Sequence, residues 1–421
     1  MLEKSRSAQI WEIFSQVGPV GDYKNAVVSF LYLDYCDSFG VANKDLASFA
    51  TYECEQYLLP VKGRITREKI QSDISKLDLD KDEYSALALE ILTKEDRRSG
   101  SVNSTSPLSE LVERLLGVQA TDVVLDLGSG YGTFLGAVAK SGKDKFFRPL
   151  LCGQEINVDA ANVSRMLLTM CDANFKIENV NSIDKMTCPS FTKGYVFPPF
   201  GMRFNMFTCN KFNASDPIFN SRTSSEWLFV FRALEAMAKN GRLVALLPEG
   251  TLFKAPDAGV RKHLVDNGLI EGIISLPANS FPWFSVKTDI IVFSRGNSSI
   301  KLIDAESVLK GLPTKGLSSH EAAVDVYNAY YSPDAKTIRK DDIKSLDTNL
   351  TLVALSAKDM YVGLSDLVKL TDVVDVLRGS PLTIANFKDN ITTRETSFKL
   401  LTSSNIENGI IDFDSLPYIG D

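Results

Sequence analysis

The residues Val123 to Leu135, which run VVLDLGSGYGTFL, decide the fold of this chain. The apolar and β-branched residues up to Leu127 predict a buried strand. Glycines at 128, 130 and 132 indicate a tight turn, and the apolar residues from Phe134 onward predict a helix directly after it. A strand, a glycine turn and a helix N-terminus with free N–H groups together indicate a nucleotide-type binding unit.

The spacing of the glycines narrows the class of ligand. A dinucleotide fingerprint has the pattern G-x-G-x-x-G, whereas here the third glycine follows the second by two residues. Asp126 also lies two residues before the first glycine. This combination resembles motif I of S-adenosylmethionine (AdoMet) methyltransferases, in which a carboxylate suits the cationic amino group of the cofactor. A dinucleotide site is the alternative that the turn alone leaves open.

The composition limits the number of domains and the cellular compartment that we expect for this chain. A chain of 421 residues predicts two or three domains, and a formal net charge of −7 means that nucleic acid could only meet a local basic patch. Six cysteines without a C-x-x-C pair and only two histidines argue against zinc and disulfide frameworks. We find no signal peptide and no apolar run of the ~20 residues that a membrane span needs. We therefore expect a cytoplasmic protein with no metal and no membrane partner.

The pattern along the chain predicts three regions: a helical domain over 1–98, a methyltransferase-type domain over 99–362, and the start of a β-rich domain over 363–421. The helical domain carries a basic cluster, made of Lys62, Arg64, Arg67 and Lys69. Such a cluster is usually a solvated face, and DNA contact is the alternative. Too few residues follow the start of the β-rich pattern to complete a domain, so we expect the chain to be a piece of a longer protein.

Alternating strands and helices predict an open, mostly parallel α/β sheet of the Rossmann type. The strands expected after the first are 150–155, 175–181, 194–197, 242–247, 269–276 and 286–293. A short connection joins the last two, which predicts an antiparallel pair at the edge of the sheet. Thr223–Glu226 has the pattern of a capping box and predicts a helix that Gly241 ends.

Two further motifs lie at the carboxyl ends of predicted strands. Glu155 ends the strand 150–155, where a carboxylate can accept hydrogen bonds from ribose hydroxyls; a surface acid at a helix start is the alternative. Phe197-Pro198-Pro199-Phe200-Gly201 forms a stiff turn that would display Phe200 for stacking on a base. The alternative is a loop proline pair beside a core phenylalanine.

In their order, these segments resemble the methylation subunit of type I restriction–modification systems, a family of DNA adenine-N6 methyltransferases. The resemblance covers about residues 100–300, and its most specific segments are Gly153–Asn157 and Leu247–Phe253. Residues 365–421 resemble the start of a target-recognition domain of the specificity-subunit type. The other segments that carry the resemblance are Ser106-Pro107, the glycine turn, Pro198–Gly201, Glu226–Phe229, Leu276–Phe281 and Val286–Phe293.

The resemblance implies a cofactor, partners and a site. AdoMet is the cofactor, and double-stranded DNA, from which the target adenine swings out, is the substrate. Specificity and restriction subunits, or a fused recognition domain, are the implied protein partners, and the oligomeric state stays open. The catalytic segment is Phe197, Pro198, Pro199 and Phe200. The cofactor-binding residues are Ser106, Pro107, Asp126, Gly128, Gly130, Gly132, Phe134, Glu155, Ile156 and Asn181.

The sequence departs from the family at the catalytic segment. Phe197 stands where the family has an Asn or Asp that accepts a hydrogen bond from the adenine N6 amine, and a phenyl ring cannot do so. Leu127 and Asn181 are smaller departures, from a proline and an acid. Either another acceptor such as Asn205 or Asn210 substitutes at Phe197, or the chain is an impaired module that binds AdoMet and DNA. A nicotinamide-dependent oxidoreductase is a third hypothesis, which the glycine spacing opposes.

Overall fold

The structure is a computed structural model, which describes most of residues 5–360 and short pieces between 391 and 419. The described stretches are 5–17, 23–41, 43–61, 64–93, 104–144, 147–188, 190–204, 208, 218–281, 285–310, 312, 316–344, 348–360, 391–392, 396, 398–399, 406–407, 410–411, 416 and 418–419. They fall into two compact units, Met1–Met360 and Tyr361–Asp421. The domain boundaries predicted near 98 and 362 lie outside the described residues.

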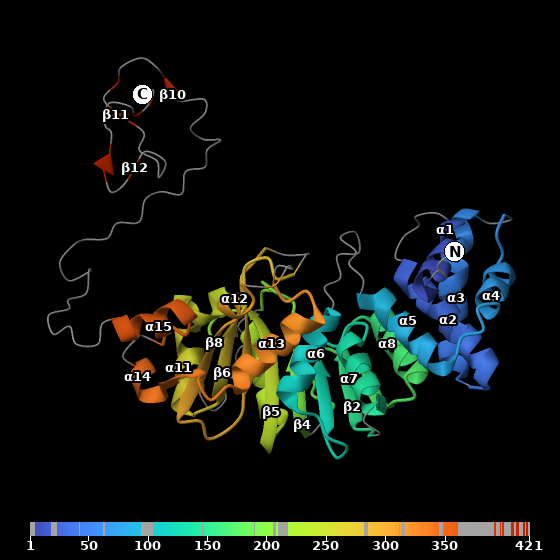
Figure 1. The fold of residues 1–421 in the computed structure, drawn as a ribbon, viewed down its shortest axis with the longest axis horizontal. Coiled ribbons are helices and arrows are strands. Elements are labelled where there is room, and N and C mark those ends of the chain that lie inside the picture. Colours follow the sequence, from blue (N-terminus) through green and yellow to red (C-terminus); the bar gives the residue numbers. More distant parts are fainter. Residues whose placement is uncertain are drawn as a thin grey trace. The chain divides into compact units, whose positions relative to one another are not determined.

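Nine strands form one sheet with the order β3-β2-β1-β4-β5-β7-β6-β8-β9 (Figure 1). The first five strands of that order are parallel to one another, β7 is antiparallel to both β5 and β6, β8 is parallel to β6, and β9 is antiparallel to β8. The predicted open, mostly parallel sheet is confirmed. The strands are β1 Val123–Leu127, β2 Leu150–Glu155, β3 Asn174–Asn179, β4 Phe191–Val196, β5 Met237–Pro248, β6 Ile270–Ser275, β7 Thr288–Phe293, β8 Ser299–Asp304 and β9 Lys336–Arg339.

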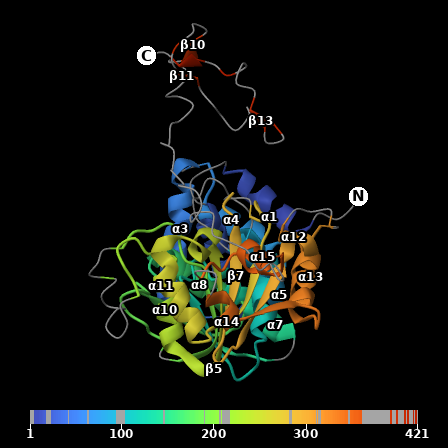
Figure 2. The same cartoon turned by 90° about the vertical axis from the view of Figure 1, so that its left-hand side faces the viewer.

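Helices cover both faces of this sheet, and Figure 2 shows α10 and α11 on one side with α7 and α13 on the other. Alternation along each strand divides the core accordingly: Leu246 joins the cluster under α6, α7, α8 and α13, while Leu247 joins the cluster under α10 and α11. The helices are α6 Ser106–Leu116, α7 Thr133–Asp144, α8 Val158–Met170, α10 Glu226–Ala236, α11 Ala258–Asp266, α12 Ala305–Val308, α13 His320–Tyr331, α14 Lys340–Lys344 and α15 Leu352–Met360, with 3₁₀ turns η2 Glu249–Leu252 and η3 Ala255–Asp257.

The N-terminal region is helical, as predicted, and its helices pack directly on the sheet's own helices. Both α2 and α5 contact α8, and α5 also contacts α7. Buried Asp34 joins three of them by accepting hydrogen bonds from Gln71, Ser75 and Tyr84. The helices are α1 Arg6–Ser15, α2 Tyr23–Phe39, α3 Lys44–Leu58, α4 Arg67–Ser75 and α5 Lys81–Thr93, with the 3₁₀ turn η1 Leu59–Val61.

Three local predictions were wrong. The antiparallel pair β6–β7 lies inside the sheet, because β8 and β9 extend the sheet beyond it. Gly241 does not end a helix: α10 ends at Ala236, and Met237 takes an extended backbone that starts β5. No capping box forms at Thr223–Glu226, because Glu226 turns away from the helix start and accepts a hydrogen bond from the Gly201 N–H at 2.9 Å.

The region from 300 to 360, where the sequence pattern weakens, contains β8, β9 and α12 to α15. Beyond it, short strands pair in two small sheets, β10-β14-β11 and β12-β13. Their bounds are β10 Ile391–Thr392, β11 Phe398–Lys399, β12 Ile406–Glu407, β13 Ile410–Ile411 and β14 Tyr418–Ile419. All five strands lie within residues 363–421, for which the sequence predicts the start of a β-rich domain.

Candidate active site

The glycine turn leads from β1 into α7 with three left-handed residues. Gly128, Gly130 and Gly132 have φ of 83°, 53° and 74°, a conformation that side chains disfavour. A Cβ on Gly132 would also lie 2.2 Å from the Ser164 Oγ, so this glycine lets α8 approach the turn. The turn is anchored to β2, because the Gly128 and Ser129 N–H groups donate to the Gln154 carbonyl at 2.9 and 3.0 Å. The backbone is therefore held at the carboxyl edge of the sheet, where an open α/β sheet binds ligands.

Glu155 is the second part of the candidate cofactor site. Its Oε2 accepts from the Gly130 N–H at 2.8 Å, and its Oε1 accepts from the Asn157 N–H at 2.7 Å. The carboxylate therefore joins the glycine turn to the start of α8. An ionised carboxylate has about four lone-pair sites, so acceptor capacity remains for two ribose hydroxyls.

Asp126 lies on β1, beside Glu155, and its side chain is 3% exposed. Burial, and next the negative charge of Glu155, raises the pKa of Asp126 to about 8. A buried acid that resists ionisation is one that a ligand's cation would stabilise. The AdoMet cofactor carries such a cation, its α-ammonium group, so the two acids and the glycine turn fit that group.

The start of α6 lies next to this arrangement. Thr105 caps the helix by accepting from the Leu108 N–H at 3.3 Å, and Pro107 occupies its first turn. Just before it, the Ser104 hydroxyl lies 3.0 Å from the hydroxyl of buried Tyr195 on β4. This bond positions Ser106 and Pro107, and neither of its partners was singled out from the sequence. The hydroxyls of Ser104 and Thr105 ahead of the proline were the available signal.

Three other predicted cofactor residues lie in different surroundings. Phe134 is fully buried against Tyr195, with ring centroids 4.7 Å apart, so a ligand would meet its backbone rather than its ring. Ile156 is 68% exposed beyond the end of β2. Asn181 uses its Nδ2 to donate to the Asp184 Oδ2 at 2.8 Å, and its Oδ1 accepts from the Ile183 N–H.

The Pro-Pro segment follows β4 at the same sheet edge. Phe197 packs against the core, its ring 5.6 Å from that of Phe200, and both rings are half-buried. Pro199 is exposed. Glu226, buried at the start of α10, ties the end of the segment through the Gly201 N–H. The sequence pattern around Glu226 predicts a helix cap and carries no signal for this role. The proposed substitute acceptors Asn205 and Asn210 lie outside the described residues.

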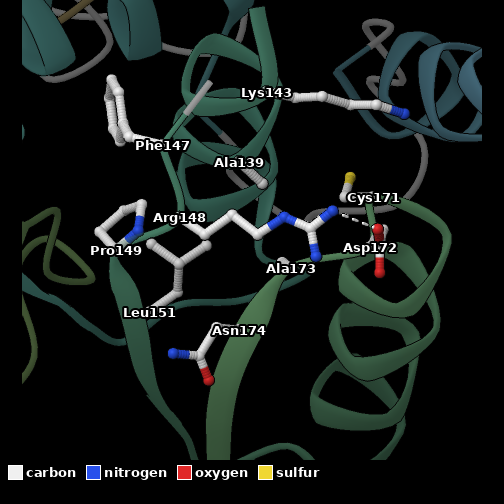
Figure 3. Close-up of a pocket in the computed structure, with 10 residues that line it drawn as sticks. All are labelled: Ala139, Lys143, Phe147, Arg148, Pro149, Leu151, Cys171, Asp172, Ala173 and Asn174. Carbon is white, nitrogen blue, oxygen red and sulfur yellow. Dashed lines mark hydrogen bonds and ion pairs between the residues drawn. The ribbon is translucent and has the colours of Figure 1, made fainter. Parts of the chain in front are cut away.

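Other surface features lie away from these residues. A small pocket at the amino end of β2 is crossed by the Arg148–Asp172 ion pair (Figure 3), at the edge opposite the glycine turn. In the basic cluster, Lys69 pairs with Asp73 at 2.7 Å and Arg67 with Glu68 at 3.7 Å. Among the described residues, no helix is long and apolar enough to cross a bilayer.

The fold, together with the glycine turn and the two acids at the carboxyl edge of the sheet, defines an AdoMet-methyltransferase type of protein. Solved structures agree: the methyltransferase subunit of a type I restriction–modification system from Streptococcus thermophilus superposes with a TM-score of 0.64 at 17% identity, over 83% of this chain and 98% of that one. A putative class I AdoMet-dependent methyltransferase from Listeria monocytogenes gives 0.52 at 13% identity, over 70% of this chain and 92% of that one.

Sequence comparison identifies the family. The N-6 DNA Methylase family model matches residues 78–359, and the chain belongs to that family. It is 24% identical to the Type I restriction enzyme MpnII methylase subunit of Mycoplasma pneumoniae over 75% of this chain. It is 21% identical to the Type II restriction enzyme and methyltransferase RM.BcgI of Heyndrickxia coagulans over 47% of this chain. The chain spans 63% and 31% of these relatives' lengths.

The predicted resemblance to type I methylation subunits is thereby confirmed, and the AdoMet cofactor inferred from the glycine turn agrees with the family. The dinucleotide alternative has no support. The roles of the individual site residues and of the C-terminal recognition domain stay predictions.

Proposed function

We propose that this chain is an AdoMet-dependent DNA adenine-N6 methyltransferase of a restriction–modification system. The observation that carries the proposal is the pair of acids at the glycine turn: Asp126, buried with a raised pKa, and Glu155, the last residue of β2, which accepts a hydrogen bond from the turn. Membership of the N-6 DNA Methylase family supports adenine N6 as the methyl acceptor. Phe197 alone favours the impaired-module alternative, and the relatives give that alternative no further support.

In this proposal each residue has a separate task. AdoMet supplies an electrophilic methyl group when bound. Asp126 holds its ammonium group, Glu155 holds its ribose, and the turn glycines allow the backbone to approach it. Phe200 stacks on the flipped adenine, and the Pro198 carbonyl accepts a hydrogen bond from its N6 amine. Glu226 fixes the Pro-Pro segment by holding Gly201.

The partners belong to the same proposal. We infer that double-stranded DNA is the substrate and that specificity and restriction functions are supplied by other subunits or by a fused domain. The relatives support this inference, since they are a type I methylase subunit and a combined restriction enzyme and methyltransferase. Residues 363–421 are assigned to target recognition on their sequence resemblance alone.

The test is transfer of a tritiated methyl group from AdoMet to mixed-sequence duplex DNA, with Asp126→Ala as the comparison. The native chain is expected to label N6 of adenine, and the variant to lose binding of S-adenosylhomocysteine and with it the labelling. A native chain that binds S-adenosylhomocysteine but leaves DNA unlabelled, also when its specificity subunit is added, would refute the methyltransferase proposal. Labelling of cytosine would refute the assigned acceptor.

A further inference from the structure

A second polar cluster lies at the carboxyl edge of the sheet, where β5, β6 and β7 meet. Asp289 on β7 pairs directly with Leu247 of β5 and with Ser275 of β6. Strand β5 ends one residue later, at Pro248, and β6 ends at Ser275 itself. Asp289 therefore lies within one residue of the carboxyl ends of β5 and β6.

The side chain of Asp289 projects to the face that α10 covers. It alternates in step with Ile291 and Phe293, which belong to the core cluster under α10 and α11. The end of the Pro-Pro segment reaches the same face, because Gly201 is bound by Glu226 at the start of α10, whereas the Phe197 ring packs on the opposite face. In register, Val196 pairs with Ala245, so Pro198 follows at the level of Leu247 and Asp289. Two strand spacings of about 4.8 Å each separate β4 from β7.

Asp289 has unused hydrogen-bonding capacity. Its side chain is 0% exposed, and neither carboxylate oxygen is in good hydrogen-bond geometry with a partner among the described residues. Burial raises the pKa of Asp289 to about 7, and the Ser275 hydroxyl beside it opposes that rise. The Thr288 hydroxyl is also buried without a partner there. The nearest charged groups are Glu249 and Lys287, which pair with each other at 2.9 Å.

Such a cluster is costly for the fold. Each buried polar group without a partner costs about 1–3 kcal/mol, and a carboxylate costs more. Buried Asp257 shows the ordinary solution in the same chain: its two oxygens accept from the Ser224 N–H at 2.7 Å and the Ser224 hydroxyl at 2.6 Å. A buried polar group that has no protein partner at a ligand-binding edge is expected to form its hydrogen bond with a ligand.

We propose that Asp289 accepts a hydrogen bond from the N6 amine of the target adenine and so supplies the acceptor that Phe197 cannot. The proposal rests on the methyltransferase function proposed above. The N6 amine has two donors; in this assignment the Pro198 carbonyl takes one and Asp289 takes the other. Accepting from both protons localises the nitrogen lone pair toward the methyl group.

Asp289 also provides a destination for the proton that the reaction releases. As the N6–methyl bond forms and the methyl–sulfur bond breaks, the amine becomes cationic. One N6 proton moves to the ionised carboxylate, which becomes a neutral acid, and the thioether product leaves uncharged. Charge and protons balance without another reactant.

The experiment compares Asp289→Leu and Asp289→Asn with the native chain, using single-turnover methyl transfer to mixed-sequence duplex DNA. We expect Asp289→Leu to slow transfer about a hundredfold, the usual effect of losing one preorganised polar contact in the transition state. Asp289→Asn keeps one acceptor oxygen and should lose less. Adding Phe197→Asn should restore transfer in the Asp289→Leu background, because the family's acceptor then returns.

Thermal unfolding separates this role from a structural one. Replacing a carboxylate that has no partner by an apolar side chain should leave the melting temperature unchanged or raise it. The matched control is Asp257→Leu, which removes a fully bonded buried carboxylate and should lower it. Native rates in Asp289→Leu, or a lowered melting temperature together with lost S-adenosylhomocysteine binding, would overturn the assignment. A native chain that methylates no DNA would instead refute the underlying function, and this assignment with it.

Discussion

At the scale of single residues, Asp126 links cofactor binding to protonation. Its pKa of about 8 means that it is mostly neutral at pH 7 in the free protein. Because the folded-state pKa is raised above the unfolded value, stability from this group is complete below about pH 4 and is lost as pH rises to about 8. A cationic ligand would reverse the shift, since an ammonium group favours the ionised carboxylate.

We therefore predict that binding of S-adenosylhomocysteine at pH 7 releases a proton and that affinity rises between pH 6 and pH 8. Calorimetry in two buffers of different ionisation enthalpy measures the release directly. Asp126→Asn should bind more weakly at pH 8, with no proton release and a flatter pH dependence. The same release in the variant would mean that another group titrates.

How far single residues could be predicted depends on where their neighbours lie in the sequence. Asp126 is two residues from the glycines it serves, so the motif itself revealed it. The placement of Asp289 beside Leu247 and Ser275 depends on the register of β7 against β5 and β6, which no local pattern reports. Phe197 was recognised as a departure, but its compensation could only be sought once the sheet edge was assembled.

At the scale of elements, the Pro-Pro segment depends on α10. The Gly201 N–H donates to Glu226 at 2.9 Å, so the start of the helix fixes the end of the segment. We predict that Glu226→Ala slows methyl transfer tenfold to about a hundredfold by misplacing Phe200, while affinity for S-adenosylhomocysteine stays native. Single-turnover rates and calorimetry test the two parts. A parallel loss of cofactor affinity would contradict this division of labour.

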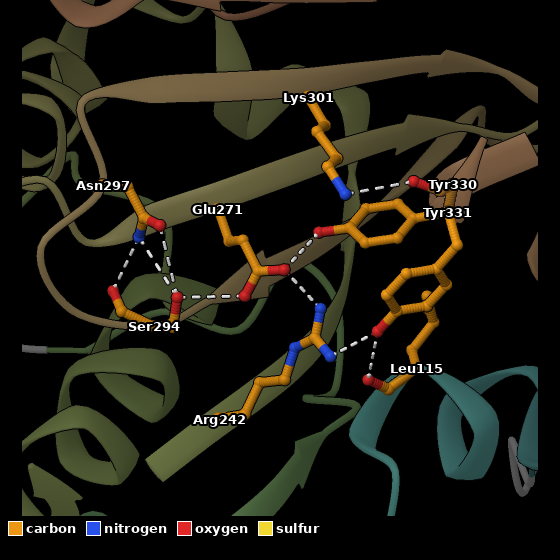
Figure 4. Close-up of polar contacts among 8 residues, drawn as sticks. All are labelled: Leu115, Arg242, Glu271, Ser294, Asn297, Lys301, Tyr330 and Tyr331. Atoms are coloured by element: carbon orange, nitrogen blue, oxygen red, sulfur yellow. Dashed lines mark hydrogen bonds and ion pairs between the residues drawn. The ribbon is translucent and has the colours of Figure 1, made fainter. Parts of the chain in front are cut away.

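Another element-level contact is the polar network that joins β5, β6 and α13 at the opposite edge (Figure 4). Glu271 accepts from Arg242 and, at 3.0 Å, from the Tyr330 hydroxyl, and its other oxygen accepts from Ser294 at 2.9 Å. The Arg242 and Glu271 side chains are only 16% and 22% exposed. Removing one partner would leave the other charge poorly solvated inside the network.

We predict that Glu271→Ala lowers the free energy of unfolding by about 3 kcal/mol, measured by urea denaturation. The matched control is the Arg148–Asp172 pair, whose side chains are 61% and 54% exposed. Arg148→Gln should cost no more than about 1 kcal/mol, because solvent screens an exposed pair. Equal losses in the two variants would show that burial does not decide the value of these ion pairs.

Whether an element could be predicted depended on the sequence pattern of that element. Strands β1, β2 and β7 each contain consecutive apolar residues and were predicted within a few residues. Gly241 was misassigned because a glycine near a helix end is usually a stop, whereas here the extended Met237 pairs with Phe191 and the strand begins earlier. Strand β8 is partly exposed and β9 is short and mostly exposed, and without them the β6–β7 pair was wrongly put at the edge.

At the scale of the whole molecule, the chain divides into the units Met1–Met360 and Tyr361–Asp421. The first contains every residue of the candidate site and the whole nine-stranded sheet. Its core is continuous from the N-terminal helices to α13, with Phe30, Leu167 and Tyr330 in one cluster. The pattern of motifs predicted the central sheet but not this continuity, which depends on α2 and α5 packing on α8.

This division predicts that cofactor binding and target choice can be separated. A chain shortened to residues 1–360 should still be stabilised by S-adenosylhomocysteine, by about 2.7 kcal/mol at a ligand concentration a hundred times Kd. If residues 363–421 contribute to target recognition, the shortened chain should label mixed-sequence DNA with less site preference than the full chain, measured by sequencing the methylated sites. Unchanged site preference would assign recognition to the first unit or to another subunit. Loss of ligand stabilisation on shortening would show instead that the second unit supports the cofactor site, although the glycine turn, Asp126 and Glu155 all lie in the first.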